Sequence, residues 1–314
     1  ATLISILALS GGAWLLWRQA SPGSSSQSAT PNPQFTISNN PIPILTPSVA
    51  ALLTKESVAL PERLNLLATI GNKLPSADRK ALLDFIGNTP PNGLTTADWH
   101  SLANDILQAL RNQQPYTPEY TDRLLVLWHN KTLDPTLRDY VLQQLREWIA
   151  DGDSRTTHEE RPEKIALIQQ TFLQVATPGH RDCDLQSTTT GTALLALDEW
   201  ANSTSPDLKV QVTSLLIAHA GDASTHRGVR STALQLCARR KIKEALPIAR
   251  TILADTSSSA ILSLSAVSFL GAMGTPEDVA LLQRLHDQNA RDPMLQASLQ
   301  KALQSLGGQA ASNK

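Results

Sequence analysis

The chain has 314 residues, 41 % of them hydrophobic and 4 % aromatic, and its 27 basic and 28 acidic residues give a net charge of −1 at pH 7. The length and apolar content allow one or two domains with a hydrophobic core. A net charge near zero excludes a chain-wide basic field, so no nucleic-acid partner is expected. The two cysteines, Cys183 and Cys237, are too few for a disulfide framework, and Cys237 lies in an apolar stripe that predicts a buried free thiol.

The first segment, residues 1–17, contains no charged side chain. As a helix it would be about 25 Å long, close to the minimum that spans a bilayer. Arg18 then marks the polar boundary, so we predict a transmembrane anchor over 1–18. The alternative is a cleaved signal peptide, because Gly11 and Ala13 are small enough for a processing site. Cleavage there would leave an apolar new terminus, which favours the anchor.

Residues 19–47 form a predicted linker. They contain no charged residue and are rich in Ser, Pro and Asn. The repeated prolines favour an extended, semi-rigid chain that holds the folded part away from the membrane. Freedom from Lys and Arg fits a translocated segment, so the helical part is expected to be extracytoplasmic, and periplasmic in a bacterium. Charge asymmetry across residues 1–18 does not fix the orientation.

Helical periodicity begins near Pro47 and continues to the end of the chain, over about fourteen helices. No segment alternates as a strand would, so the fold class is all-α. We assign 48–187 to a helical domain, with divergent repeats as one option, and expect long loops at 151–162 and 177–191. Helix starts are predicted where a capping side chain precedes Pro or an acidic first turn, at Ser76, Thr117-Pro118, Asp134-Pro135, Ser205-Pro206 and Asp292-Pro293. Pro135, Pro206 and Pro293 each have Leu two residues later, which indicates related helices in different units.

A repeat is visible from Arg227 to about Leu306, where one pattern recurs at a spacing of 33 residues. Its apolar positions fall at i, i+4, i+7 and i+8, the buried stripe of a helix. They align Val229 with Leu262 and Leu295, Ala233 with Ala266 and Leu299, Leu236 with Phe269 and Ala302, and Cys237 with Leu270 and Leu303. A second helix follows in the first two copies, so each unit is predicted to be a helical hairpin. Such hairpins must stack to bury their apolar faces, as in an α-solenoid.

The repeat resembles a known family in its sequence Ile261-Leu262-Ser263-Leu264-Ser265-Ala266-Val267-Ser268-Phe269-Leu270-Gly271, followed by Pro276-Glu277-Asp278-Val279-Ala280-Leu281-Leu282. This pattern resembles the HEAT repeat. The resemblance is clear over 227–306, continues less distinctly back to 188, and departs from the pattern where the usual basic residue is Ser263 or Gln296. It implies an α-α superhelix over 188–306 that binds a protein or scaffolds an assembly, followed by a disordered tail at 307–314. It supplies no catalytic residues.

Several groups of reactive side chains are candidates for a functional site. The run His180-Arg181-Asp182-Cys183-Asp184 contains four types of ligand-bearing or charged side chain, but adjacent residues rarely converge on one ion, so we interpret it as a solvated loop. His219 and His226 flank a turn and are expected to be capping or surface residues. Trp99, Trp128, Trp148 and Trp200 are expected in the core rather than in a groove. We therefore predict no catalytic residue, no cofactor site and no metal site.

One segment of the chain, a basic cluster, carries a much larger positive charge than the rest. Seven basic residues stand against the single acid Glu244 between positions 226 and 250, a local balance of +6. They are Arg227, Arg230, Arg239, Arg240, Lys241, Lys243 and Arg250. Helix-dipole capping accounts for Arg239 to Lys241 but not for Arg227 and Arg230, which stand at a helix start. The alternative interpretation is a docking patch for an acidic partner, and all of these residues except Arg250 are its candidates.

We therefore predict a membrane-anchored, HEAT-like helical-repeat protein that acts as a binding or scaffolding module for another macromolecule and is not an enzyme. A protein partner is expected, and the basic cluster would favour an acidic one. The main alternative is an enzyme on a HEAT-like scaffold, similar to the alkylpurine DNA glycosylases or the bilin lyases. Another is a helical accessory module of a cell-wall enzyme.

Overall fold

The structure of the chain is a computed structural model that describes residues 44–54, 57–114, 118–151, 161–203, 206–289 and 292–312. All regular secondary structure in these ranges is helical, which confirms the all-α prediction. None of the helices described there combines the length and the apolar character needed to cross a bilayer. The predicted anchor at 1–18, and the linker up to Pro43, lie outside the described residues. The anchor therefore stays a prediction.

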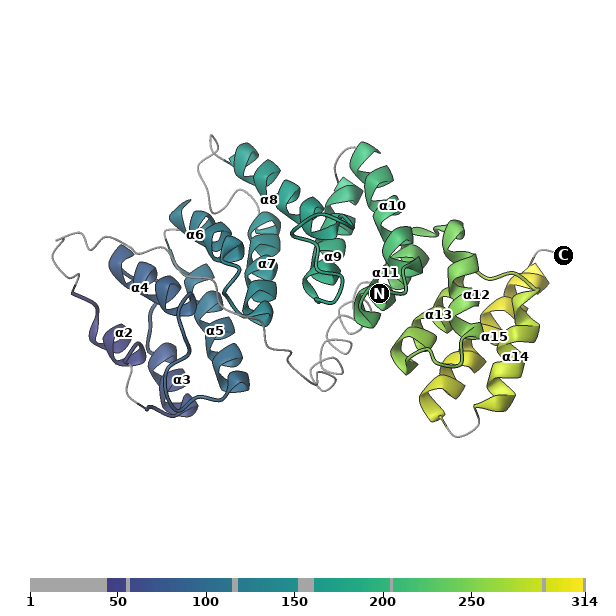
Figure 1. Ribbon diagram of the computed structural model, residues 1–314, viewed down its shortest axis with the longest axis horizontal. Helices are drawn as coiled ribbons and strands as arrows, with labels where there is room; N and C mark the ends of the chain where they lie inside the picture. The colour runs from purple at the N-terminus through teal and green to yellow at the C-terminus, as the bar shows by residue number, and fades with distance from the viewer. Residues whose placement is uncertain are drawn as a thin grey trace. The chain divides into compact units, whose positions relative to one another are not determined.

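The described helices form two layers that alternate along the chain (Figure 1). Each odd-numbered helix packs against the next odd-numbered helix, from α3 to α15, in one continuous layer. Each even-numbered helix packs mainly on the odd-numbered helix that follows it. Successive hairpins thus bury one another's apolar faces, which is the arrangement of a helical repeat.

The odd-numbered layer consists of α3 (Leu60–Ala68), α5 (Thr96–Arg111), α7 (Pro135–Ala150), α9 (Thr189–Ser203), α11 (Arg227–Arg240), α13 (Ala260–Met273) and α15 (Pro293–Ser312). The even-numbered helices are α2 (Pro47–Leu52), α4 (Ser76–Ile86), α6 (Pro118–His129), α8 (Arg161–Ala176), α10 (Pro206–Gly221), α12 (Leu246–Ala254) and α14 (Asp278–Gln288). A short 3-10 turn, η2 (Lys243–Ala245), precedes α12.

The 33-residue repeat corresponds to α11, α13 and α15, which begin at Arg227, Ala260 and Pro293 as predicted. The aligned apolar positions are buried, apart from Leu295 and Leu303, which are partly buried. The predicted hairpin partners are wrong, however. The sequence pairs each of these helices with the one after it, whereas α12 packs mainly on α13 and α14 mainly on α15. The apolar stripe of α12 therefore faces forward along the chain.

The last helix, α15, covers both α13 and α14, as expected for the terminal element of a stack. It approaches α13 closely, because a Cβ atom added at Gly271 would lie 2.9 Å from both Cα and Cβ of Ala302. This contact explains why Gly stands near the end of α13. The prediction of a disordered tail at 307–314 is wrong over most of that segment, since α15 continues to Ser312.

Two of the predicted helix starts are confirmed by their caps. Asp134 accepts hydrogen bonds from the backbone N–H groups of Thr136 and Leu137, over 2.8 and 3.4 Å. Asp292 does the same at the start of α15. The third Pro-x-Leu helix, α10, belongs to the other layer, so it is not equivalent to α7 and α15. At α4, Ser76 is the first helical residue and not the cap.

No domain boundary separates the expected regions 48–187 and 188–306 in the described part of the chain. Residues from Ile44 onward form one compact unit, and α9 packs against α7, α8, α10 and α11. The hydrophobic core runs through both regions. The four tryptophans predicted to lie in the core are buried in it, namely Trp99, Trp128, Trp148 and Trp200.

Candidate functional site

The structure places five of the seven residues of the basic cluster in two groups at opposite ends of α11, whereas Lys243 lies in η2 and Arg250 in α12. Arg227 and Arg230 lie in the first turn, whereas Arg239, Arg240 and Lys241 lie at the last turn and just beyond it. At a rise of about 1.5 Å per residue, the helix places Lys241 about 20 Å from Arg227. The cluster is therefore not one patch.

Arg239 and Arg240 both bind Asp198, a buried residue of α9. Nη2 of Arg240 also donates to the Asp198 carbonyl oxygen over 3.0 Å. The Arg240 side chain is only 6 % exposed, whereas that of Arg239 is 49 % exposed. Burial lowers the pKa of both guanidinium groups. Contrary to the prediction, Arg240 is not available to a partner, because it neutralises a buried carboxylate between α9 and α11.

Other cations in and near the cluster have similar partners. Arg250 of α12 forms two hydrogen bonds to the Asp278 carboxylate, over 2.7 and 3.0 Å. Burial raises the pKa of Asp278, but the bonds from Arg250 and Thr275 lower it by more, so the pKa lies below its usual value. On the odd-numbered layer, Arg146 of α7 donates to Glu199 of α9 over 3.0 Å. Ion pairs of this kind connect one hairpin to the next.

At the start of α11, Arg230 also has a partner within the protein. Nε of Arg230 donates to the Ala220 carbonyl oxygen over 3.2 Å. Burial lowers the pKa of Arg230, and the charges of Asp222 and Asp255 oppose this shift. Arg227 is exposed. Arg230 therefore binds the end of α10 and lies close to two acids, which leaves it poorly placed for an anionic partner.

Two exposed cations remain at the end of α11, Lys241 and Lys243. No hydrogen bond or ion pair joins either side chain to another residue in the part of the chain that the structure describes. Lys241 has φ 58° and ψ 41°, the left-handed conformation, and it is the one non-glycine residue with positive φ among the described residues. Its N–H bonds Ala238 O, and the N–H of Ile242 bonds Cys237 O, which together form a Schellman cap.

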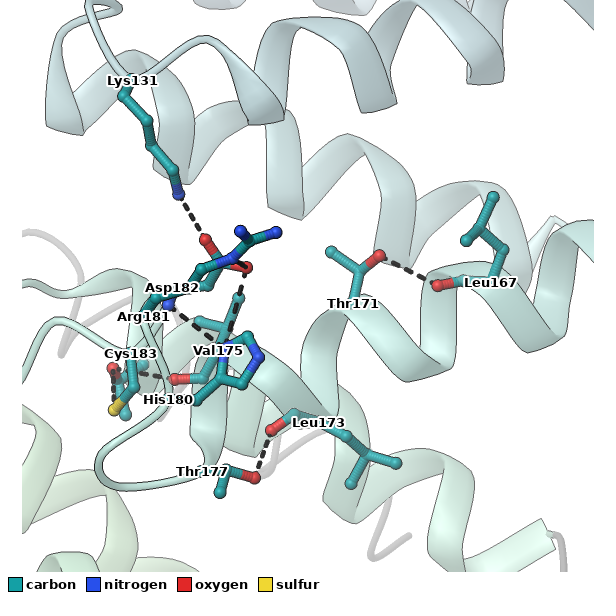
Figure 2. A network of polar contacts seen from close by, with 11 residues as sticks. Lys131, Leu167, Thr171, Leu173, Val175, Thr177, His180, Arg181, Asp182 and Cys183 are labelled. Carbon is teal, nitrogen blue, oxygen red and sulfur yellow. Dashed lines mark hydrogen bonds and ion pairs between the residues drawn. The ribbon is translucent and has the colours of Figure 1, made fainter.

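The α8–α9 connection is not the solvated loop that its sequence predicts. Asp182 is buried, and the Lys131 ammonium from the α6–α7 connection lies 2.5 Å from its Oδ1 (Figure 2). The backbone N–H of Asp182 donates to His180 Nδ1 over 3.2 Å. Burial raises the pKa of Asp182, but Lys131, His180 and Arg181 lower it by more, so the pKa lies below its usual value. Asp182 thus ties this connection to the preceding hairpin.

The same connection also contacts the following hairpin. The His226 N–H donates to Leu185 O over 2.6 Å. The nearby Cys183 sulfur lies 4.0 Å from the Thr190 hydroxyl oxygen, and burial raises the pKa of this thiol. Over the described ranges no three His, Cys, Asp or Glu side chains gather as metal ligands would. The segment 177–188 therefore connects three successive hairpins through its hydrogen bonds and its ion pair.

The two histidines that flank the α10–α11 turn differ from each other. His226 is the N-cap of α11, where its Nδ1 accepts from the Gly228 N–H over 3.2 Å, as the sequence predicts. His219 is fully buried, with Nε2 2.6 Å from the Ala176 carbonyl oxygen, so the expectation of a surface or capping role is wrong for it. Burial lowers the pKa of His219. A neutral imidazole then joins α10 to the end of α8.

Comparison with known proteins gives little further information. A scan of protein families finds no match for the chain, and a search of curated proteins finds none. Among solved structures, the chain is similar to human deoxyhypusine hydroxylase in complex with glycerol, with 14 % sequence identity and a TM-score of 0.32. That alignment covers 83 % of this chain and 95 % of the other. The helical-repeat architecture described above rests on the chain's own helix contacts.

Proposed function

We propose that the chain is a HEAT-like helical-repeat protein that binds an acidic region of a partner protein at the turn after α11. Lys241 and Lys243 would form the contact, with the half-exposed side chain of Arg239 two residues before Lys241 in the chain. An anchor at residues 1–17 would hold the helical unit at a membrane, on the extracytoplasmic side. The chain would act by holding its partner and not by catalysis.

The observation that carries this proposal is the conformation of Lys241. An L-residue in the left-handed region costs about 1 kcal/mol or more relative to glycine, and glycine is the usual residue at this position of a Schellman cap. Lysine therefore stands where glycine would make the fold more stable. Its ammonium group is exposed and has no partner in the described residues, so the structure of the helix end does not explain the choice. A role of this lysine in binding would explain why it stands there.

The test separates the charge from the backbone. Lys241→Gly should raise the unfolding free energy by about 1 kcal/mol, because it removes the strain, and it should still weaken binding. A Lys241→Gln, Lys243→Gln double variant should weaken binding several-fold. Photo-crosslinking in membranes from a probe at position 243 would identify the partner, with a probe at position 301 as the control. Binding of that partner that is unaffected by the double variant and by salt up to about 0.3 M would reject the site.

A further inference from the structure

A groove of about 420 Å³ lies between α4, the end of α5 and α6. This volume falls in the range of about 300–1,000 Å³ that is usual for ligand pockets. Its apolar lining includes Leu83, Leu110 and Tyr120, all buried, and the side of α6 contributes Val126. Val126 is 60 % exposed, so most of its side chain is open to solvent. The groove thus presents apolar surface that no other part of the described chain covers.

The hydroxyl group of Tyr120, which lines the groove, is already hydrogen-bonded within the protein. The Tyr120 O–H donates to the Leu107 carbonyl oxygen over 3.1 Å, so its hydrogen-bonding capacity is directed into the core. The apolar part of the groove therefore fits an aliphatic or aromatic side chain. A purely polar ligand would leave this surface exposed to water.

Two of the three acids around the groove are paired with lysines. Asp84 lies 2.6 Å from Lys80 Nζ, and Asp122 lies 3.0 Å from Lys164 Nζ. Glu119 accepts a long hydrogen bond of 3.5 Å from a serine hydroxyl at the start of α4. Glu119 is thus the one acid of the three without a cation partner among the described residues.

The cations of the groove are less well matched. Arg79 of α4 is half-buried, and no hydrogen bond or ion pair joins its side chain to any residue that the structure describes. It stands one helical turn before Leu83, so its guanidinium group and the apolar floor share one face of α4. Arg123 lies 3.6 Å from Asp84, a long contact that Asp84 shares with Lys80. The groove therefore complements an anion, and a guanidinium group best binds a carboxylate or phosphate.

We propose that the groove between α4 and α6 binds an acidic peptide segment of a partner protein, in which a carboxylate side chain stands next to an apolar one. Arg79 binds the carboxylate, and the surface formed by Leu83, Tyr120 and Val126 receives the apolar side chain. This binding mode explains both the exposed valine and the guanidinium group that has no partner in the described ranges. The proposal shares with the proposed function only the premise that the chain binds a protein, and it uses a different surface.

The experiment uses the full chain and a fluorescent, end-capped hexapeptide with two glutamates next to a leucine and a phenylalanine. Two companion peptides replace the glutamates by glutamine, or the leucine and phenylalanine by serine. Fluorescence anisotropy should show saturable binding of the first peptide and at least five-fold weaker binding of the other two. Arg79→Gln and Val126→Ser should each weaken the first peptide by a similar factor.

Matched variants make the result specific. Lys301→Gln removes an exposed cation of α15 and should leave peptide affinity unchanged, as should the Lys241→Gln, Lys243→Gln variant. Unchanged urea midpoints would show that Arg79→Gln and Val126→Ser are folded. Equal binding of all three peptides, or peptide affinity that Arg79→Gln does not alter, would overturn the proposal. Saturation by 4-methylpentanoate with no binding of the peptide would also overturn it, and would reassign the groove to a small apolar carboxylate.

Discussion

Asp198 and Asp139 are two buried carboxylates of the odd-numbered layer with opposite surroundings. Asp198 binds both Arg239 and Arg240. Asp139 of α7 has no cation partner among the described residues, and its side chain accepts hydrogen bonds from neutral groups there, such as Thr188 and Gln143 at 3.3 Å each. Its Oδ1 lacks any hydrogen-bond partner in the described structure. Asp198 thus has two cationic partners, whereas Asp139 has only neutral hydrogen-bond donors among the described residues.

The same substitution should therefore have opposite effects at the two positions. Asp198→Asn leaves the buried Arg240 unpaired and should lower the unfolding free energy at pH 7 by about 3 kcal/mol. Asp139→Asn removes a carboxyl group whose charged form is disfavoured by burial, and it should raise the unfolding free energy at pH values above the folded pKa of Asp139. Urea unfolding measures both, and Glu199→Gln is the control, because the exposed Arg146–Glu199 pair should contribute less than about 1 kcal/mol. Equal losses in all three variants would contradict this account.

The effect of Asp139→Asn should also depend on pH. Burial raises the pKa of Asp139, and the hydrogen bonds from Thr192, Thr188 and Gln143 do not offset the increase. The folded state then binds a proton more tightly than the unfolded state, so this group destabilises the fold above its folded pKa. The gain from Asp139→Asn should be full above the raised pKa of the folded state and should disappear as the pH falls through that pKa toward the unfolded value. A gain that is independent of pH would show that the charge is not its cause.

The residue-scale contacts were the least predictable part of the molecule. The partners of Arg239 and Arg240 lie 41 and 42 residues earlier in the chain, and that of Lys131 lies 51 residues later. A local charge count shows an excess of cations where the fold brings acids from the neighbouring hairpin. The left-handed conformation of Lys241 has no local sequence signal, because the usual signal for it is a glycine and the chain has a lysine there. The groove at Arg79 depends on contacts between α4, α5 and α6 that no motif marks.

At the scale of helices, the sequence predicted where the helices lie in the chain better than it predicted which helices pack together. The 33-residue spacing and the i, i+4, i+7, i+8 stripe located α11, α13 and α15 correctly. The stripe shows which face of a helix is buried, but both neighbours of α12 offer an apolar surface, so periodicity alone does not say which one covers it. The pairing of α12 with α13 is decided by packing. Upstream of Arg227 the spacing drifts, although the alternation of the two layers continues.

The contact between α13 and α15 gives an element-scale prediction. Gly271→Ala adds a methyl group 2.9 Å from the backbone of Ala302, and it should lower the unfolding free energy by about 1–3 kcal/mol because the two helices must move apart. Gly307→Ala is the matched control on α15, where no atom lies within 4 Å of the added Cβ. That change should raise stability by about 0.5–1 kcal/mol, since alanine favours the helix. If thermal or urea unfolding shows that both variants gain stability, the close approach of α13 and α15 is wrong.

At the scale of the whole molecule, residues from Ile44 onward form one compact unit with a continuous core. Each hairpin is covered by the next, so the unit has what it needs to fold without the residues that precede it. The uncharged segment at 1–17 is then free to serve another purpose, and the proposed purpose is attachment to a bilayer.

Alkaline extraction of membranes tests whether residues 1–17 attach the chain to the bilayer. The full chain should stay in the membrane pellet, because an uncharged segment of about 17 residues inserted in the bilayer is not displaced by high pH. A chain that begins at Ile44 should be recovered in the supernatant, with the same helical content and melting temperature as the full chain in detergent. A third chain, with Leu7→Lys and Leu9→Lys, keeps the length of the segment but places two charges within it, and it should also be extracted. Retention of this charged chain or of the shortened one would show that the helical unit itself binds the membrane, and extraction of the full chain would reject the anchor.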